Sequence, residues 1–216
     1  NDLDIEDDAL RPMYSVSPKG WAQSKTVTIT YPGSSDKREY SLDGGITWQN
    51  YTKALTFNSN GYVIAKNTVG SNYINGNTQT VTQVDPTPPT EATFSYTVTS
   101  KSIKVVANGY DPESGVKYFQ FSNDNGASWS AVQEGSTYSF TNLKSGTYKI
   151  KIRAINATYE NHKLSGSYLE SAMQEVSTAT INQPTYSVSP DTSNWVQKKT
   201  VTITYDSGYK NEYSID

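Results

Sequence analysis

The chain has 216 residues, a formal net charge of −3 and no cysteine, which excludes disulfides and thiolate metal sites. Its single histidine and three scattered arginines exclude a His-rich metal site and a basic nucleic-acid surface. No apolar run is long enough to cross a bilayer, so we expect neither a nucleic-acid partner nor a membrane span in this fragment.

The first segment, residues 1–11, is acidic. Its acidic side chains are Asp2, Asp4, Glu6, Asp7 and Asp8. A short run of like charge is typical of a solvated segment, so we expect a linker or the end of a preceding module.

Residues 12–88 are predicted to form a first module, module A. Val27, Ile29 and Tyr31 alternate with threonines, a pattern typical of a strand with one buried face. The predicted strands lie near 13–17, 25–31, 37–42, 47–51, 53–57, 61–67 and 78–84. Asp43-Gly44 and Asn60-Gly61 are interpreted as hairpin turns, because these residue types accept positive φ.

Module A is followed by a predicted linker, and module B is predicted over residues 89–183. The linker should be stiff, because proline fixes φ and removes hydrogen-bond donors. Its residues are Asp85, Pro86, Thr87, Pro88, Pro89 and Thr90. In module B, Ile103, Val105 and Ala107 alternate with Lys104 and Val106. The predicted strands lie near 92–98, 101–108, 116–122, 129–133, 136–140, 146–156 and 173–181. The best helix candidate is short, over 168–173.

The chain then repeats its own beginning. Residues 184–190 match 12–18, and Lys-Thr-Val-Thr-Ile-Thr-Tyr occurs at 25–31 and at 199–205. We therefore expect residues 184–216 to be the N-terminal part of a second module A, truncated at Asp216 inside a turn, as in a window cut from a longer array. Trp21 and Trp195 occupy matching places, so we expect them to pack alike.

A weaker repeat relates the two modules to each other. Ser-x-Asp-x-Gly-x-Thr/Ser-Trp occurs once in module A, at 41–48, and once in module B, at 122–129. Seven short alternating strands in each module favour an all-β fold, with tandem immunoglobulin-like or fibronectin type III-like β-sandwiches in an elongated array.

Module B resembles the fibronectin type III-like modules of secreted and surface proteins of Gram-positive bacteria. The stretches that carry this resemblance are 102–107, 111–116, 121–129, 138–143 and 146–153. Module A resembles the bacterial Ig-like modules that alternate with them, through 26–31, 39–48 and 60–65. The resemblance implies spacer, stalk or accessory roles outside the cell.

The motif that both modules share resembles the Asp-box of sialidases, which in that family is a folded hairpin away from the catalytic centre. Its residues here are Ser41, Asp43, Gly45, Trp48, Ser122, Asp124, Gly126 and Trp129. We expect the aspartates to cap the turns, the glycines to take positive φ and the tryptophans to close the hairpins over apolar neighbours. The scattered arginines do not form the cluster that a sialidase needs for its substrate carboxylate.

Two further places are candidate chemical sites. Asp111 and Glu113 lie in a loop between two strands, where carboxylates are weak candidates for binding Ca²⁺ and otherwise cap a turn. His162 lies in a polar loop without a recognisable serine or cysteine nucleophile, so we expect it to be exposed. We therefore predict no catalytic residue, no cofactor-binding residue and no enzyme activity, with Ca²⁺ as the one open cofactor.

The sequence leaves three functions open, all for an extracellular protein that is secreted or held at the cell surface. The first is a structural spacer or stalk, with adhesion as an added role and neighbouring modules as its partners. The second is a self-assembling filament or surface-layer subunit, since an incomplete module exposes strand edges. The third is a module that binds carbohydrate or a host surface protein, suggested by 17 tyrosines and four tryptophans.

Overall fold

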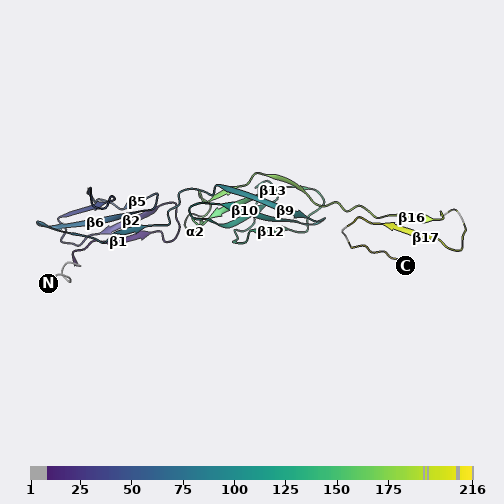
Figure 1. The fold of residues 1–216 in the computed structure, drawn as a ribbon, viewed down its shortest axis with the longest axis horizontal. Coiled ribbons are helices and arrows are strands. Elements are labelled where there is room, and N and C mark those ends of the chain that lie inside the picture. Colours follow the sequence, from purple (N-terminus) through teal and green to yellow (C-terminus); the bar gives the residue numbers. More distant parts are fainter. Residues whose placement is uncertain (1–8, 192, 194, 208–209, 216) are drawn as a thin grey trace.

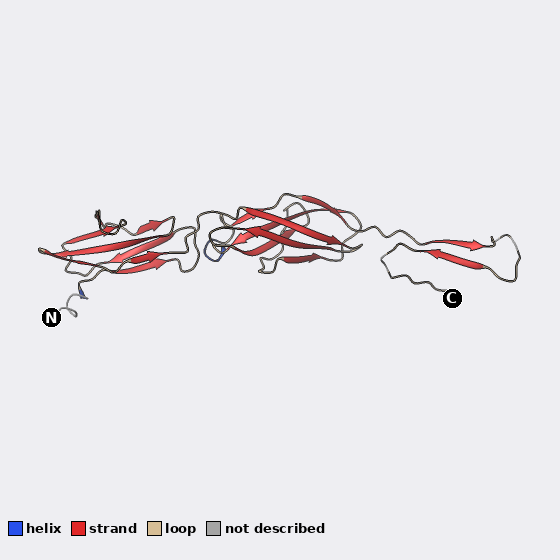
Figure 2. Ribbon diagram, viewed as in Figure 1, coloured by secondary structure: helices blue, strands red, loops and turns tan. Residues whose placement is uncertain are grey.

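The structure is a computed structural model that describes residues 9–191, 193, 195–207 and 210–215. It is an all-β protein of antiparallel sheets (Figure 2). Module A, module B and a two-stranded hairpin follow one another along the long axis of the molecule (Figure 1). Of the acidic linker predicted over 1–11, the part with Asp2, Asp4, Glu6, Asp7 and Asp8 lies outside the described residues.

Module A consists of two sheets around one core. One sheet has the order β1-β2-β5, from Met13–Ser17, Lys25–Thr30 and Leu55–Phe57. The other has the order β4-β3-β6-β7, with β8 also paired to β6, from Gln49–Asn50, Lys37–Ser41, Gly61–Val69, Asn72–Asn75 and Gln79–Val81. The buried core residues are Val27, Ile29, Val63, Ala65, Val81 and Val84. The alternation of β2 thus marks the face that packs on the second sheet.

Module B repeats this plan. One sheet has the order β12-β10-β9, from Thr137–Phe140, Ile103–Tyr110 and Glu91–Val98. The other has the order β11-β13-β14, with β15 also paired to β13, from Val116–Ser122, Thr147–Asn156, Tyr168–Glu170 and Gln174–Ser177. The buried core residues are Ile103, Val105, Ala107, Phe119, Phe121, Ile150, Ile152, Ala154 and Val176. Both complete modules are therefore two-sheet β-sandwiches.

Strand prediction failed in three places. The predicted helix over 168–173 is wrong, because residues 168–170 form β14 and the short helix is instead α2, Tyr159–His162. No strand forms over 129–133, where Gln133 makes only an isolated bridge to Phe119. Strand β7 was not predicted, since its polar sequence Asn-Tyr-Ile-Asn lacks a strong alternation.

The prediction of a hairpin at Asn60-Gly61 is also wrong. This pair joins β5 to β6, which belong to different sheets, so the chain crosses between sheets there. Neither residue has positive φ, and the Asn60 side-chain oxygen instead accepts the Val84 N–H at 3.0 Å. A turn dipeptide alone does not distinguish a hairpin from a crossover, because both reverse the chain.

Gly109 offers a test of how closely the two sheets of module B pack. A Cβ added there would lie 2.6 Å from the Ala154 Cβ and 3.0 Å from the Glu91 carbonyl oxygen. We expect Gly109→Ala to lower the stability of module B by about 1–3 kcal/mol, since overpacking forces backbone shifts. The control is Gly33→Ala, where a Cβ has open space. If the two variants unfold at the same urea concentration, the close packing of the two sheets at Gly109 is contradicted.

Candidate functional site

The most elaborate polar arrangement in the described chain lies where module A meets module B. The end of module A is held to its own 19–24 loop, because the Ala22 N–H donates to the Gln83 carbonyl at 3.1 Å and the Asp85 N–H donates to the Ala22 carbonyl at 2.9 Å. The last residue of module A before the prolines therefore enters the junction in a fixed direction.

Asp85 is the centre of this junction, and it is fully buried. One carboxylate oxygen accepts the backbone N–H and the hydroxyl of Thr87, both at 3.1 Å. The other accepts the Ser114 hydroxyl at 2.5 Å and the Asn156 amide at 3.1 Å. Asp85 is thus bonded to the loop after β10 and to the last residue of β13, both in module B.

Asn156, at the end of β13, connects these groups from the side of module B. Its side-chain nitrogen lies 2.9 Å from the Thr87 carbonyl and 3.0 Å from an Asp111 carboxylate oxygen. Its side-chain oxygen accepts the Thr158 hydroxyl at 2.7 Å. Because Asn156 is fully buried, this amide has no water with which to replace those partners.

Asp111 caps the loop that follows β10. Its other carboxylate oxygen accepts the backbone N–H groups of Glu113, Ser114 and Gly115 at 3.1, 2.9 and 3.1 Å. The turn role that the sequence allowed for Asp111 is therefore formed. The same bonds position Ser114, whose hydroxyl then reaches Asp85.

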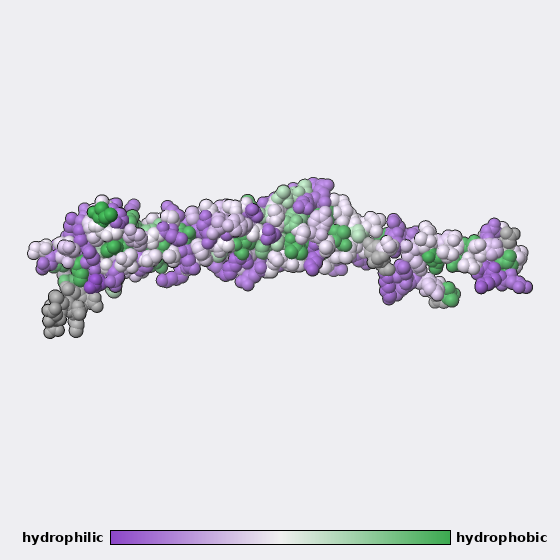
Figure 3. Space-filling model, in the orientation of Figure 1, coloured by the Kyte–Doolittle hydropathy of each residue, from purple (hydrophilic) through white to green (hydrophobic). Residues whose placement is uncertain are grey.

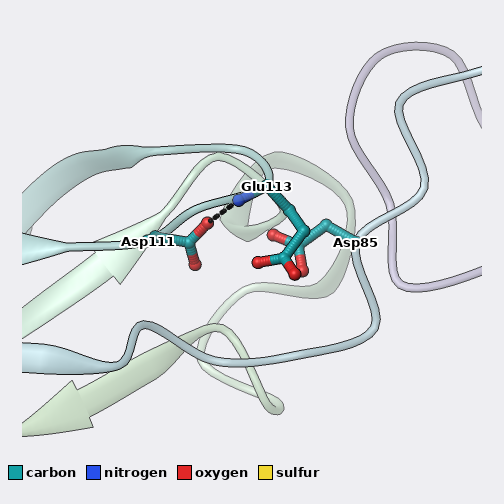
Figure 4. A group of neighbouring side chains, drawn as sticks. All are labelled: Asp85, Asp111 and Glu113. Atoms are coloured by element: carbon teal, nitrogen blue, oxygen red, sulfur yellow. Dashed lines mark hydrogen bonds between the residues drawn. The ribbon is translucent and has the colours of Figure 1, made fainter.

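The two residues predicted as weak metal candidates, Asp111 and Glu113, lie beside each other, and Asp85 joins them (Figure 4). One carboxylate oxygen from each residue lies within 4.8 Å of the others, with Asp85 and Asp111 buried and Glu113 exposed. Carboxylate oxygens are the donors that Ca²⁺ takes from loops, so this set has the chemistry for that ion. In the structure, hydrogen bonds from neutral groups already occupy the two buried carboxylates, and Ca²⁺ binding stays a prediction.

A second set of contacts joins the modules through the α2 loop. The Asn161 side chain donates to the carbonyls of Lys19 and Trp21, each at 2.8 Å. The Gln23 N–H donates to His162 Nε2 at 3.0 Å, and the Gln23 side chain donates to the Ser165 carbonyl. The expectation of an exposed His162 is wrong: its side chain is half-buried and binds the neighbouring module.

The two hairpin motifs form almost identical turns outside the junction. The Ser41 hydroxyl donates to Asp43 at 2.7 Å and accepts the Gly45 N–H at 2.8 Å, and Asp43 accepts the Thr47 N–H at 2.9 Å. In module B, the Ser122 hydroxyl donates to Asp124 at 2.7 Å and accepts the Gly126 N–H at 2.8 Å, and Asp124 accepts the Ser128 N–H at 2.9 Å. Gly45 and Gly126 have φ of 93° and 86°.

The tryptophan of each motif lies over its own turn. The Trp48 and Trp129 rings lie against Gly45 and Gly126, and each ring also faces a cation. Lys66 Nζ is 4.2 Å from the Trp48 ring centroid, and the Arg153 guanidinium is 4.0 Å from that of Trp129. Cations at such distances are attracted by the aromatic face. Each indole therefore lies between its turn glycine and a cation.

The turn aspartates give a pH prediction. The Ser128 hydroxyl, with Ser122 and the Ser128 N–H, lowers the pKa of Asp124 to about 2. A carboxyl whose pKa is lowered by folding adds stability above its ordinary pKa, and that stability is lost as the pH falls toward the folded value. We expect Asp124→Asn to lower the melting temperature above about pH 5 and to have progressively less effect from about pH 4 to pH 2. A difference that stays constant down to pH 2 would contradict the assigned bonds.

No model of a known protein family matches the sequence, and no curated protein matches it. Fibronectin(III)-like modules of Clostridium thermocellum CbhA align with a TM-score of 0.43 and 12% identity, over 77% of this chain and 93% of that chain. A chain of a cytokine receptor complex aligns with a TM-score of 0.34 and 15% identity, over 78% and 97%.

Sequence reasoning missed the two central junction residues, Asp85 and Asn156. Asp85 was assigned to a linker, although Asp-Pro-Thr is a common turn sequence. Asn156 follows the buried Ile155 where the alternation of β13 breaks off, which was the one local signal of an unusual position. The partners that these two residues bind across the junction are 29 to 71 residues away in sequence, so no local pattern predicts them.

The expectation that Trp21 and Trp195 pack alike is wrong for this chain, since Trp21 is half-buried and Trp195 is fully exposed. None of the helices among the described residues combines the length and apolar character needed to cross a membrane.

Proposed function

We propose that the chain is a non-catalytic spacer of a secreted or cell-surface protein, in which modules A and B form one stiff rod. The buried Asp85 is the observation that supports this best. A flexible linker leaves its polar side chains in water, whereas Asp85 of module A bonds to Ser114 and Asn156 of module B. Two modules joined in this way extend a protein without bending it.

Several other features support the same function. The modules lie end to end with the hairpin beyond them (Figure 1), so each unit adds length. The surface in view mixes polar and apolar residues along its whole length (Figure 3). A bacterial cell-surface setting and an adhesive role belong to this proposal, and they are supported by the resemblance of the repeated modules.

Small-angle X-ray scattering of the purified chain tests the spacer function. We expect the distance distribution of an elongated rod, unchanged between low salt and high salt, because the junction bonds are buried and weakly screened. A compact particle, or a maximum dimension that changes strongly with salt, would contradict a stiff spacer.

Carbohydrate binding is a second candidate function, favoured by one surface groove in module A. Its volume is about 540 Å³, and its lining includes Tyr40, Leu42, Tyr62, Asn58 and Asn60. An exposed aromatic beside amides suits a sugar ring, and Tyr62 is 41% exposed. A glycan array screens this candidate: binding that Tyr62→Ala removes would support it, and an array without a binder would exclude it in favour of the spacer.

A further inference from the structure

The C-terminal hairpin reproduces the first two strands of module A residue by residue. Strands β16, Thr185–Ser189, and β17, Thr200–Thr204, pair with Tyr186 opposite Ile203 and Val188 opposite Val201. Strands β1 and β2 pair with Tyr14 opposite Ile29 and Val16 opposite Val27. The register is identical, so each residue of the hairpin has a known counterpart in a complete module.

In module A that register is covered on one face and at one edge. Strand β5 pairs with the free edge of β2, with Lys25 opposite Phe57 and Val27 opposite Leu55. The second sheet covers the apolar face, so Val27 is 0% and Ile29 is 4% exposed. An equivalent hairpin would therefore pair with a strand at the edge of its second strand and pack a sheet against its apolar face.

In the hairpin the same positions are open. Val201 is 58% and Ile203 is 36% exposed, and β17 pairs only with β16 among the described strands. An unpaired edge beside an exposed apolar face favours the addition of a strand. The hairpin therefore has the open strand edge that pairs with β5 in module A and the apolar face that the second sheet covers there.

The hairpin segment repeats one tyrosine hydrogen bond of module A, whereas the tyrosine that makes a second such bond in module A has an exposed counterpart here. The Tyr31 hydroxyl donates to the Glu39 carbonyl at 2.5 Å in module A, and its counterpart Tyr205 donates to the Glu212 carbonyl at 2.7 Å. Tyr14, in contrast, accepts the Ala65 N–H of β6 at 2.7 Å. The counterpart of Tyr14, Tyr186, is 77% exposed. A backbone N–H of a β6-like strand would donate a hydrogen bond to the Tyr186 hydroxyl in the same way.

We infer that the β16–β17 hairpin is a binding site for a polypeptide with the strand set of module A that follows its Asp43, residues 44–85. The β5 part of that polypeptide would pair with β17, and its β6 and β8 parts would cover Val201 and Ile203. An intact second copy is a poor occupant, because its own β5, β6 and β8 are already engaged by its β1 and β2. This inference does not depend on the spacer function.

Grafting gives the most direct test. Asp216 matches Asp43 in the repeat, so residues 44–85 can be added directly after Asp216 of the full chain. We expect amide hydrogen exchange at Val201 and Ile203 to slow by at least about 100-fold, approaching the rates at Val27 and Ile29, because a closed sandwich protects its inner strands. Exchange at the hairpin that stays as fast as in the ungrafted chain would overturn the inference.

Two variants of the grafted chain separate this site from nonspecific collapse. Val201→Asp combined with Ile203→Asp places charges on the face to be covered and should abolish the protection. Thr202→Ser changes the opposite face and should preserve it. Protection that survives the aspartates would overturn the inference.

Adding the polypeptide 44–85 as a separate molecule to the ungrafted chain distinguishes the occupants. A 1:1 complex in sedimentation, lost with the same aspartates, supports the site. If the ungrafted chain alone dimerises through the hairpin, and the aspartates prevent that dimer, the occupant is a second copy and the inference is overturned.

Discussion

Ile29→Ala is expected to lower the stability of module A by about 2–5 kcal/mol, the usual cost of removing a buried isoleucine side chain down to its Cβ. The same change at the matching position, Ile203→Ala, should cost less than about 0.5 kcal/mol. The reason is burial: Ile29 is 4% exposed between two sheets, whereas Ile203 is 36% exposed on the lone hairpin.

Native-state hydrogen exchange in increasing urea measures both variants, because it follows module A separately from module B. Strand β10 of module B is the internal reference and should be unaffected by either change. Equal losses from Ile29→Ala and Ile203→Ala would mean that the hairpin is packed, and would contradict the exposed face on which its binding role depends.

Asp85→Ala is expected to destabilise the paired modules by about 1–3 kcal/mol, the cost of leaving a buried hydrogen-bonding group without its partner. The change leaves the half-buried Ser114 hydroxyl without its acceptor and removes one of three acceptors around the Asn156 amide, which keeps the Thr87 carbonyl and Asp111. Removing this carboxylate also relieves repulsion with the buried Asp111 and the exposed Glu113, so we expect a loss in the lower part of that range.

Thermal unfolding by calorimetry measures this effect, in buffer with a chelator so that only hydrogen bonds of the protein contribute. Asp36→Ala is the matched control, because Asp36 is exposed and accepts a single backbone bond from Gly70. If Asp85→Ala unfolds at the same temperature as Asp36→Ala, the junction contributes little, and modules A and B are joined by a tether.

The strands and their repetition could be predicted because both are local properties of the sequence. Alternation identified β2 and β10, whose buried and exposed residues alternate without exception in β2 and over 103–108 in β10. Strand β14 escaped prediction since three half-buried residues, Tyr168–Glu170, show no alternation. Its conformation is set by pairing with β13, where Arg153 lies opposite Glu170.

The junction could be predicted only in part. The turn that Asp111 caps is local, so Asp111 and Glu113 were noticed from their own loop. The partners of Asp85 come from the 111–116 loop and from the end of β13, which only the folded module B brings together. The groups that fix the orientation of the modules are consequently visible in the structure and hidden in the sequence.

A stiff spacer requires modules A and B to form one rigid body, and a spin-label distance measurement tests that directly. The chain has no cysteine, so Lys53→Cys and Lys144→Cys, both at exposed positions, can be labelled cleanly across the A–B junction. A second pair, Lys144→Cys and Thr202→Cys, spans the linker before the hairpin, where residues 180–184 are exposed. With a rigid junction, we expect a single narrow distance distribution for the first pair and a broader one for the second. A first-pair distribution as broad as the second would contradict the rigid junction.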